Sequence, residues 1–212
     1  MNSEHPVNTI YHDVADYYSK KLAEFGECAK GVDWNSEEVQ VLRFEQLFLI
    51  TGQLRNYSLT DLGCGYGAMY DYLVTLNPDV VYHGVDISKD MIDAANRQHA
   101  HHPKARFTQA SEPDRITDFC VASGIFNVKL GRSNDEWAAY LLATLDVLNR
   151  NSSRGFAFNC LTSYSDQEKM RADLYYADPL YLFDLCKRKY SRHVSLIHDY
   201  GLYEFTILVR KT

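Results

Sequence analysis

What this 212-residue chain lacks first is a long apolar run. A membrane-spanning helix needs ~18 to 20 predominantly apolar residues in a row, and no stretch of the sequence provides them. The opening residues MNSEHPVNTI also lack the basic and then apolar order of a secretory signal. The sequence therefore predicts a protein with no membrane partner and a cytoplasmic location.

Cysteines at metal-binding or disulfide spacing are also missing. The chain has no C-x-x-C pair and no histidine cluster near a cysteine, so a zinc site or a disulfide framework is not expected. The neighbouring His101 and His102 are better explained as the end of a helix than as metal ligands. The five cysteines are Cys28, Cys64, Cys120, Cys160 and Cys186. The sequence predicts no bound metal.

Basic residues are in the minority. The chain has 22 Lys and Arg against 28 Asp and Glu, which gives a net charge of −6. Proteins that bind a phosphate backbone usually display a basic face, so this balance argues against nucleic acid as a partner. With 46% hydrophobic residues, a chain of this length can bury a full core, and we expect one domain over residues 1–212.

One dense motif stands out against these absences: the nine residues LTDLGCGYG, from Leu59 to Gly67. The leucines suit a buried strand of a parallel sheet, and Gly63, Gly65 and Gly67 remove every Cβ from the turn that follows. A ligand can then approach backbone N–H groups and the N-terminus of the next helix, where unpaired donors favour a negative group. The motif predicts a site for an anionic or zwitterionic ligand.

Two types of nucleotide site compete for this motif. The dinucleotide fingerprint is spaced G-x-G-x-x-G and needs no acid before its first glycine. Here the spacing is G-x-G-x-G, and Asp61 precedes Gly63 by two residues. Its carboxylate would repel a pyrophosphate and attract an ammonium group. The motif therefore favours a ligand that carries an amino acid.

A second acid follows the next predicted strand, which spans residues 80–85. Asp86 lies at the carboxyl end of that strand, 25 residues after Asp61, where it can accept hydrogen bonds from both ribose hydroxyls of a nucleoside. This position would serve NAD equally well, so Asp86 indicates a nucleoside without choosing the cofactor. Ser88 is then the expected N-cap of a helix that His102 and Pro103 end.

With these residues the chain resembles the class I S-adenosylmethionine-dependent methyltransferases, whose first motif is an acid, a hydrophobic residue and G-x-G-x-G. The resemblance implies S-adenosylmethionine as the cofactor. It places the turn residues Gly63, Cys64 and Gly65 against that cofactor, and Ile87 and Met91 on either side of its adenine. It further adds Ser123, after the fourth strand, to the cofactor site.

The N-terminal segment YHDVADYYSKK supports the same resemblance, because it is similar to the F-D-x-x-A-x-x-Y stretch of many small-molecule methyltransferases. Tyr18 matches the tyrosine that helps to enclose the cofactor. The alternative is that the tyrosines are simply a helix packing face. Arg43 interrupts an apolar helix stripe and could reach the methionine carboxylate of the cofactor or form a surface salt bridge. We expect residues 1–52 to form a helical cap or lid on a core of residues 53–212.

The remaining elements alternate between strand and helix, which predicts a Rossmann-like α/β sandwich. The last two strands are separated by only four residues, so they must form an antiparallel hairpin. The resemblance implies a mostly parallel seven-stranded sheet in the order 3-2-1-4-5-7-6, with an antiparallel last strand. The predicted strands cover residues 59–62, 80–85, 105–109, 118–122, 155–161, 193–198 and 203–209.

The sequence departs from the family at two strand ends. After the third strand most relatives have an acid that reaches the adenine amino group, but here Ser111 takes that place and Glu112 follows, so either side chain could substitute. The fourth strand is followed by neither the N/D-P-P-Y signature, typical of enzymes that methylate base nitrogens, nor an acid. The missing acid removes one ligand of magnesium-dependent catechol-type enzymes.

The expected reaction is transfer of an activated methyl group, in which alignment and exclusion of water do much of the work. A hydroxyl acceptor of high pKa needs a base, whereas a carboxylate or phosphonate acceptor needs cationic anchors. We expect O-methylation of a small molecule, with His12 as the candidate base. The candidate acceptor-binding residues are Tyr11, Trp34, Phe126, Asn127, Lys129, Asn159 and Tyr164.

Two other functions are compatible with the motifs. An aminopropyl transferase uses a related cofactor but would be expected to show further acids for a polyamine acceptor. A catalytically silent cofactor-binding or scaffold subunit could keep Asp61 and Asp86 while losing the acceptor-binding residues.

Overall fold

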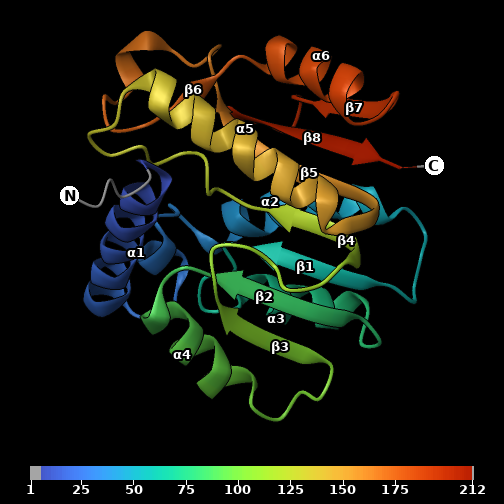
Figure 1. The fold of residues 1–212 in the computed structure, drawn as a ribbon. Helices are drawn as coiled ribbons and strands as arrows, with labels where there is room; N and C mark the ends of the chain where they lie inside the picture. The colour runs from blue at the N-terminus through green and yellow to red at the C-terminus, as the bar shows by residue number, and fades with distance from the viewer. Residues whose placement is uncertain (1–5, 212) are drawn as a thin grey trace.

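The central strands are short, mostly apolar runs, and the computed structural model, which describes residues 6–211, buries nearly all of their side chains. Figure 1 shows these strands side by side. Among these residues eight strands form one sheet in the order β3-β2-β1-β4-β5-β8-β7, with β6 pairing to β5. The strands are β1 (Ser58–Leu62), β2 (Val81–Asp86), β3 (Ala105–Gln109), β4 (Thr117–Ala122), β5 (Ser152–Thr162), β6 (Tyr176–Ala177), β7 (His193–Ile197) and β8 (Glu204–Arg210). The predicted strand order and Rossmann-like class are confirmed.

Only β8 runs against its neighbours, because it pairs antiparallel with both β5 and β7. The β7–β8 connection is too short for a parallel crossover, as the sequence predicted. The two-residue strand β6 was not predicted; it pairs in parallel with Leu161 and Thr162 at the end of β5. A pair of residues is too short for a strand pattern to be recognised in the sequence.

Alternate residues of the strands feed two apolar cores, one on each face of the sheet. On one face, Cys120 and Ala122 of β4 pack with α5 (Asn134–Arg150) and α6 (Pro179–Lys189). On the other, Phe119 and Val121 pack with α2 (Glu37–Phe48), α3 (Ala68–Leu76) and α4 (Lys89–His99). This gives the predicted three layers. No helix among residues 6–211 has both the length and the apolar content to cross a bilayer.

The helix starts follow the capping residues of the sequence. The side chains of Ser36, Ser88 and Asp178 accept hydrogen bonds from the first turns of α2, α4 and α6, and Ser133 forms a capping box with Glu136 at the start of α5. The chain also forms three short 3-10 turns: η1 (Ala29–Val32), η2 (Leu49–Thr51) and η3 (Gln167–Lys169).

The predicted cap begins with α1 (Pro6–Phe25) and continues through η1 and α2. The helix ends at Phe25, because Gly26 adopts a left-handed φ of 77°. Residues 1–5 of the predicted cap lie outside the described residues. The arrowheads of β1 and β2 point towards α1, so the carboxyl edge of the sheet faces this helix (Figure 1).

Candidate cofactor and acceptor site

The glycine turn after β1 is bound to the end of β2. The backbone N–H groups of Gly63 and Cys64 both donate to the carbonyl of Val85, at 2.7 and 3.1 Å. Gly63 has a φ of 80°, and a Cβ there would lie 2.1 Å from the Cγ2 of Ile125. Only glycine gives both this backbone conformation and this close approach. The turn therefore lies tightly between the ends of β1, β2 and β4.

Asp86 connects the turn to the start of α4. One carboxylate oxygen accepts the Gly65 N–H at 2.9 Å, and the other accepts the Ser88 N–H at 2.8 Å. Burial raises the pKa of this carboxyl group, and the backbone hydrogen bonds oppose the rise. Each oxygen retains acceptor capacity for a further donor. Asp86 can thus hold the turn and still accept a hydroxyl group of a ligand.

Asp61 has one free oxygen. Its Oδ2 accepts the Tyr82 hydroxyl at 2.6 Å, but its buried Oδ1 has no hydrogen-bond partner among the described residues. Burial raises the pKa of Asp61 to about 7, and the charge of Asp86 adds to the rise. A cationic donor would satisfy the free oxygen and stabilise the ionised form. This orphaned atom fits the ammonium group that the sequence predicted.

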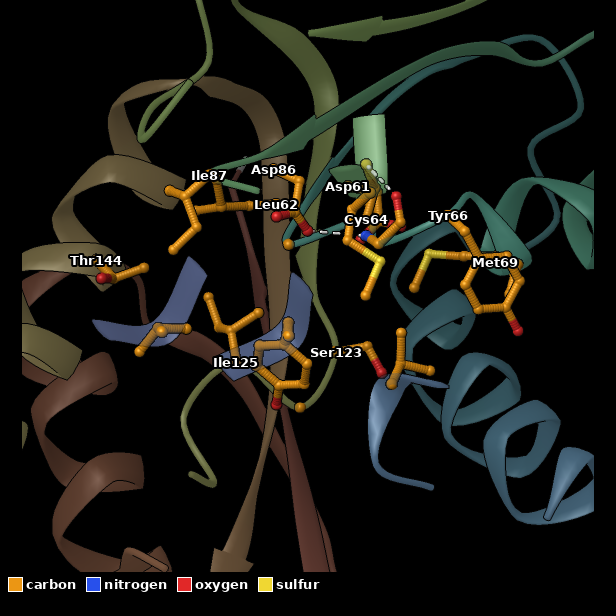
Figure 2. Close-up of a pocket in the computed structure, with 18 of the residues that line it drawn as sticks. Asp61, Leu62, Cys64, Tyr66, Met69, Asp86, Ile87, Ser123, Ile125 and Thr144 are labelled. Atoms are coloured by element: carbon orange, nitrogen blue, oxygen red, sulfur yellow. Dashed lines mark hydrogen bonds between the residues drawn. The ribbon is translucent and has the colours of Figure 1, made fainter. Parts of the chain in front are cut away.

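A cavity lies in front of these acids, with about 940 Å³ of space free of protein atoms, including its opening to solvent. Figure 2 shows Ile87 and Thr144 towards one end, Tyr66 and Met69 towards the other, and Asp61 between them. Most predicted cofactor residues and two predicted acceptor residues line this cavity: Tyr11, Tyr18, Trp34, Asp61, Gly63, Cys64, Gly65, Asp86, Ile87, Met91, Ser111 and Ser123. The structure thus brings together residues that the sequence separates by up to 112 positions, since Ser123 lies 112 residues after Tyr11.

Ser123 contributes the second orphaned polar atom of the cavity. Its hydroxyl is buried and has no hydrogen-bond partner among the described residues. The side chain lies beside the cavity at the end of β4 (Figure 2). A buried hydroxyl without a partner costs free energy, so it is suited to bind a polar group of a ligand.

Arg43 does not line the cavity. Its guanidinium donates to both oxygens of Glu204, at 2.5 and 2.8 Å, and to the carbonyl of Val39. The Trp34 ring stacks on it, with 3.9 Å between the Arg43 Cζ and the ring centroid. Glu204 therefore takes the place of the cofactor carboxylate that the sequence had suggested as the partner of Arg43. The alternative of a surface salt bridge is also replaced, because this pair is buried.

Asn159 extends the same buried pair to the turn after β4. Its amide nitrogen donates to Glu204 at 3.0 Å, and its oxygen accepts the Gly124 N–H at 2.7 Å. Gly124 has a φ of 76°, and a Cβ there would lie 2.3 Å from the Trp34 ring. Asn159 thus holds the turn at Gly124 in place, and its own side chain does not line the cavity.

Other predicted residues also lie outside the cavity lining. His12 has a side chain that is 76% exposed, next to Asp16. Glu112 pairs with Arg150, and Lys129 donates to the carbonyl of Arg132. Phe126 lies in the core, Asn127 accepts the Leu161 N–H, and Tyr164 is 63% exposed.

Several lining residues on helices were not predicted from the sequence. The sequence does not distinguish them, because an apolar helix stripe does not reveal which of its side chains faces a cavity. They include Gln40 and Phe44 of α2, Met69 of α3, Tyr140 and Thr144 of α5, and also Tyr66 and Ile125 of the turns.

The N-terminal helix α1 lines the cavity and is held there by side-chain contacts to other parts of the chain. The ring of Tyr11 packs edge-on against Tyr140, with centroids 5.9 Å apart. The hydroxyls of Ser19 and Ser88 lie 3.0 Å apart, and Asp13 pairs with Arg132. Burial raises the pKa of Tyr18, which therefore keeps its proton at neutral pH.

Within residues 6–211 no group of three or more His, Cys, Asp or Glu could hold a metal ion.

Known proteins resemble this chain in sequence. A family model described as a methyltransferase domain matches residues 60–151, from the glycine motif to the end of α5. Rv1506c of Mycobacterium tuberculosis, a protein named as a methyltransferase, is 59% identical over 155 residues. The aligned part is 73% of this chain and 93% of Rv1506c.

Solved structures resemble it in fold. The Synechocystis PCC 6803 magnesium protoporphyrin IX methyltransferase with bound S-adenosylhomocysteine is 13% identical, with a TM-score of 0.64 over 95% of this chain and 99% of that one. A Burkholderia thailandensis 1,6-didemethyltoxoflavin-N1-methyltransferase, also with S-adenosylhomocysteine, is 18% identical, with a TM-score of 0.62 over 100% and 92%. At these identities the likeness concerns the fold alone.

Proposed function

The chain belongs to the class I S-adenosylmethionine-dependent methyltransferases, and we propose that it methylates an oxygen atom of a small-molecule acceptor. The observation that carries this proposal is the juxtaposition, in one cavity, of two carboxylates, an aromatic wall and the unpartnered Ser123 hydroxyl. The lining is concave and mostly apolar with a few polar groups, as is typical of a small-molecule site. No basic surface is needed for such an acceptor.

The cofactor supplies a methyl group on a sulfonium, and the protein has to orient that group and exclude water. We assign the free oxygen of Asp61 to the cofactor ammonium and the Asp86 carboxylate to its ribose hydroxyls. The N-terminus of α3, which follows the glycine turn, suits its carboxylate. Ile87 and Met91 are the proposed contacts of the adenine.

The acceptor is assigned to the other part of the lining, beside Trp34 and Ser123. The Ser123 hydroxyl can accept a hydrogen bond from an acceptor hydroxyl and so orient its oxygen for attack, and the proton of that hydroxyl is released to water as the O–CH3 bond forms and the S–CH3 bond breaks. Burial raises the pKa of Tyr11 and Tyr140, so these phenols remain protonated donors at neutral pH. Hydroxyl-rich surroundings of this kind favour an oxygen acceptor.

We also propose that the part of the predicted 1–52 cap that precedes α2, up to about residue 35, acts as a lid, whereas α2 packs in the core through Phe44 and Leu47. The segment contributes Tyr11, Tyr18 and Trp34 to the lining, and its exposed contacts, such as the pair of Asp13 with Arg132, can break without loss of the core. Closing the cap would exclude water from the reacting groups. Opening it would release the product.

The test is transfer of a ¹³C-labelled methyl group from S-adenosylmethionine to a pool of extracted metabolites. Mass spectrometry should find a labelled small molecule, and the carbon chemical shift of its new methyl group should be that of a methoxy group. A labelled N-methyl or C-methyl product would contradict O-methylation, and transfer to no small molecule would contradict the acceptor class.

A further inference from the structure

Charge in the cavity is all of one sign. The charged side chains that line it are Asp61 and Asp86, and among the described residues the lining contains no Lys, Arg or His. The remaining side chains of the lining are apolar, aromatic or hydroxyl-bearing, apart from the amide of Gln40 and the thiol of Cys64. A carboxylate or phosphonate acceptor would need a cationic partner here, because moving an anion into a partly enclosed site without one is costly.

One cation does contact the lining, but its charge is matched. Arg43 lies behind the Trp34 ring, and both oxygens of Glu204 accept its hydrogen bonds. The side chains of the pair are 8% and 2% exposed. Glu204 also accepts from Asn159, so the carboxylate is held in place. The buried pair is neutral as a unit and offers no free positive charge through the indole.

The glycine turn does not supply an anion site for the acceptor. The N–H groups of Gly63, Cys64 and Gly65 are already bonded to Val85 and Asp86, and the N-terminus of α3 is matched by the carboxylate that the cofactor itself brings. The bound cofactor has one net positive charge, from a sulfonium, an ammonium and a carboxylate. The two aspartates together exceed that charge by one when both are ionised. The cofactor-loaded cavity is therefore still not positive.

From this one-sided charge we infer that the acceptor carries no net negative charge. The acceptor class is an uncharged or cationic small molecule, not a carboxylate, phosphate or phosphonate. This inference rests on the proposed function and narrows it. The six aromatic side chains of the lining, Tyr11, Tyr18, Trp34, Phe44, Tyr66 and Tyr140, suit the apolar faces of such a molecule.

The test separates a metabolite extract on an anion exchanger at neutral pH, so that every candidate acceptor is either retained or unretained. Each fraction is incubated with protein and methyl-labelled S-adenosylmethionine. In parallel, each is dialysed to equilibrium against the S-adenosylhomocysteine complex, and the enriched compounds are identified by mass spectrometry. The dialysis reports binding without turnover.

We expect at least roughly tenfold more labelled product from the unretained fraction, a ratio that corresponds to about 1.4 kcal/mol of charge discrimination. The dialysis should enrich compounds of the unretained fraction only. Transfer to, or enrichment of, a compound from the retained fraction would overturn the inference while leaving the methyl transfer intact. Failure in both assays, by a protein that binds S-adenosylhomocysteine, would contradict the proposed function, and the inference would fall with it.

Discussion

The wall of the cavity that follows β1 and β2 depends on contacts between residues close in the chain, whereas the opposite wall depends on distant ones. Asp86 bonds to residues 2 and 21 positions away, Ser88 and Gly65. The opposite wall, formed by Trp34 and Gly124, is supported by a pair that joins Arg43 to Glu204 across 161 positions. We call these the motif wall and the distal wall. A motif can encode the first, but only the complete fold creates the second.

The largest effect should come from breaking the support of the distal wall. Glu204→Ala leaves the buried Arg43 without its partner and should lower the free energy of unfolding by about 3 to 5 kcal/mol. Denaturant titration measures this change. Asp184→Ala, which removes the partner of the exposed Arg188, is the matched control and should change little.

A double variant sharpens that result. Replacing the pair together, as Arg43→Met with Glu204→Leu, should recover much of the lost stability, since no unpaired charge remains. A loss for the double variant as large as the sum of the two single losses would show that the pair does not act as a unit.

A change in the motif wall should alter the affinity for the cofactor. Asp86→Ala removes a charged acceptor of the ribose hydroxyls and of two backbone amides, and should weaken binding of S-adenosylhomocysteine by about 2 to 4 kcal/mol. Calorimetric titration gives the value, and Asp90→Ala, in the first turn of α4 shortly after Asp86, serves as control. Unchanged affinity in a folded Asp86→Ala protein would mean that Asp86 does not contact the cofactor.

Two glycines with nearly equal φ isolate the contact between Trp34 and the turn after β4. Gly124→Ala and Gly201→Ala both force alanine into a left-handed conformation, at 76° and 75°, which costs about 1 to 2 kcal/mol. Only at Gly124 would the new Cβ also meet a neighbour, the Trp34 ring. Gly124→Ala should therefore cost more, by roughly 1 kcal/mol or above.

The Trp34→Ala background provides the control for that comparison. Removing the ring should reduce the cost of Gly124→Ala to about that of Gly201→Ala, measured by denaturant titration. An undiminished cost would show that Trp34 does not pack on Gly124 in solution.

A further expected effect is a pH dependence from Asp61, whose folded pKa of about 7 is above its ordinary value of 3.8. Between these values the folded state binds the proton of this carboxyl group more tightly than the unfolded state does. The free energy of unfolding without ligand should therefore fall as pH rises from about 4 to 7, with a slope of at most about 1.4 kcal/mol per pH unit, and level off above. Asp61→Asn, which keeps an acceptor for Tyr82, should be less stable at low pH relative to wild type than at pH 8, and a difference independent of pH would contradict the assignment.

The motif wall could be predicted from the sequence because its signals are local. The glycines of the turn, Asp86 at a strand end and the Ser88 cap each indicate the backbone conformation of the few residues around them. The same holds for the Ser133 capping box and for the β7–β8 hairpin. These predictions concern backbone geometry, which a short segment determines largely by itself.

The distal wall could not be predicted, because its residues acquire their roles only through tertiary contacts. Asn159 was taken as an acceptor contact, yet its amide is used by Glu204 and Gly124. Arg43 was considered for the cofactor, and nothing near it in the sequence indicated a partner in β8. Tyr140 and Thr144 share the apolar stripe of α5 with core residues, and only packing distinguishes them.

The central claim is that the two walls and the cap form one cofactor-binding site, and hydrogen exchange with and without S-adenosylhomocysteine tests it most directly. We expect increased protection at residues 63–67 and, in the same experiment, along α1 and around Trp34. Protection of the glycine turn with unchanged exchange in α1, together with full ligand affinity after deletion of residues 1–35, would contradict the cap. Unchanged exchange in all of these segments would contradict the site itself.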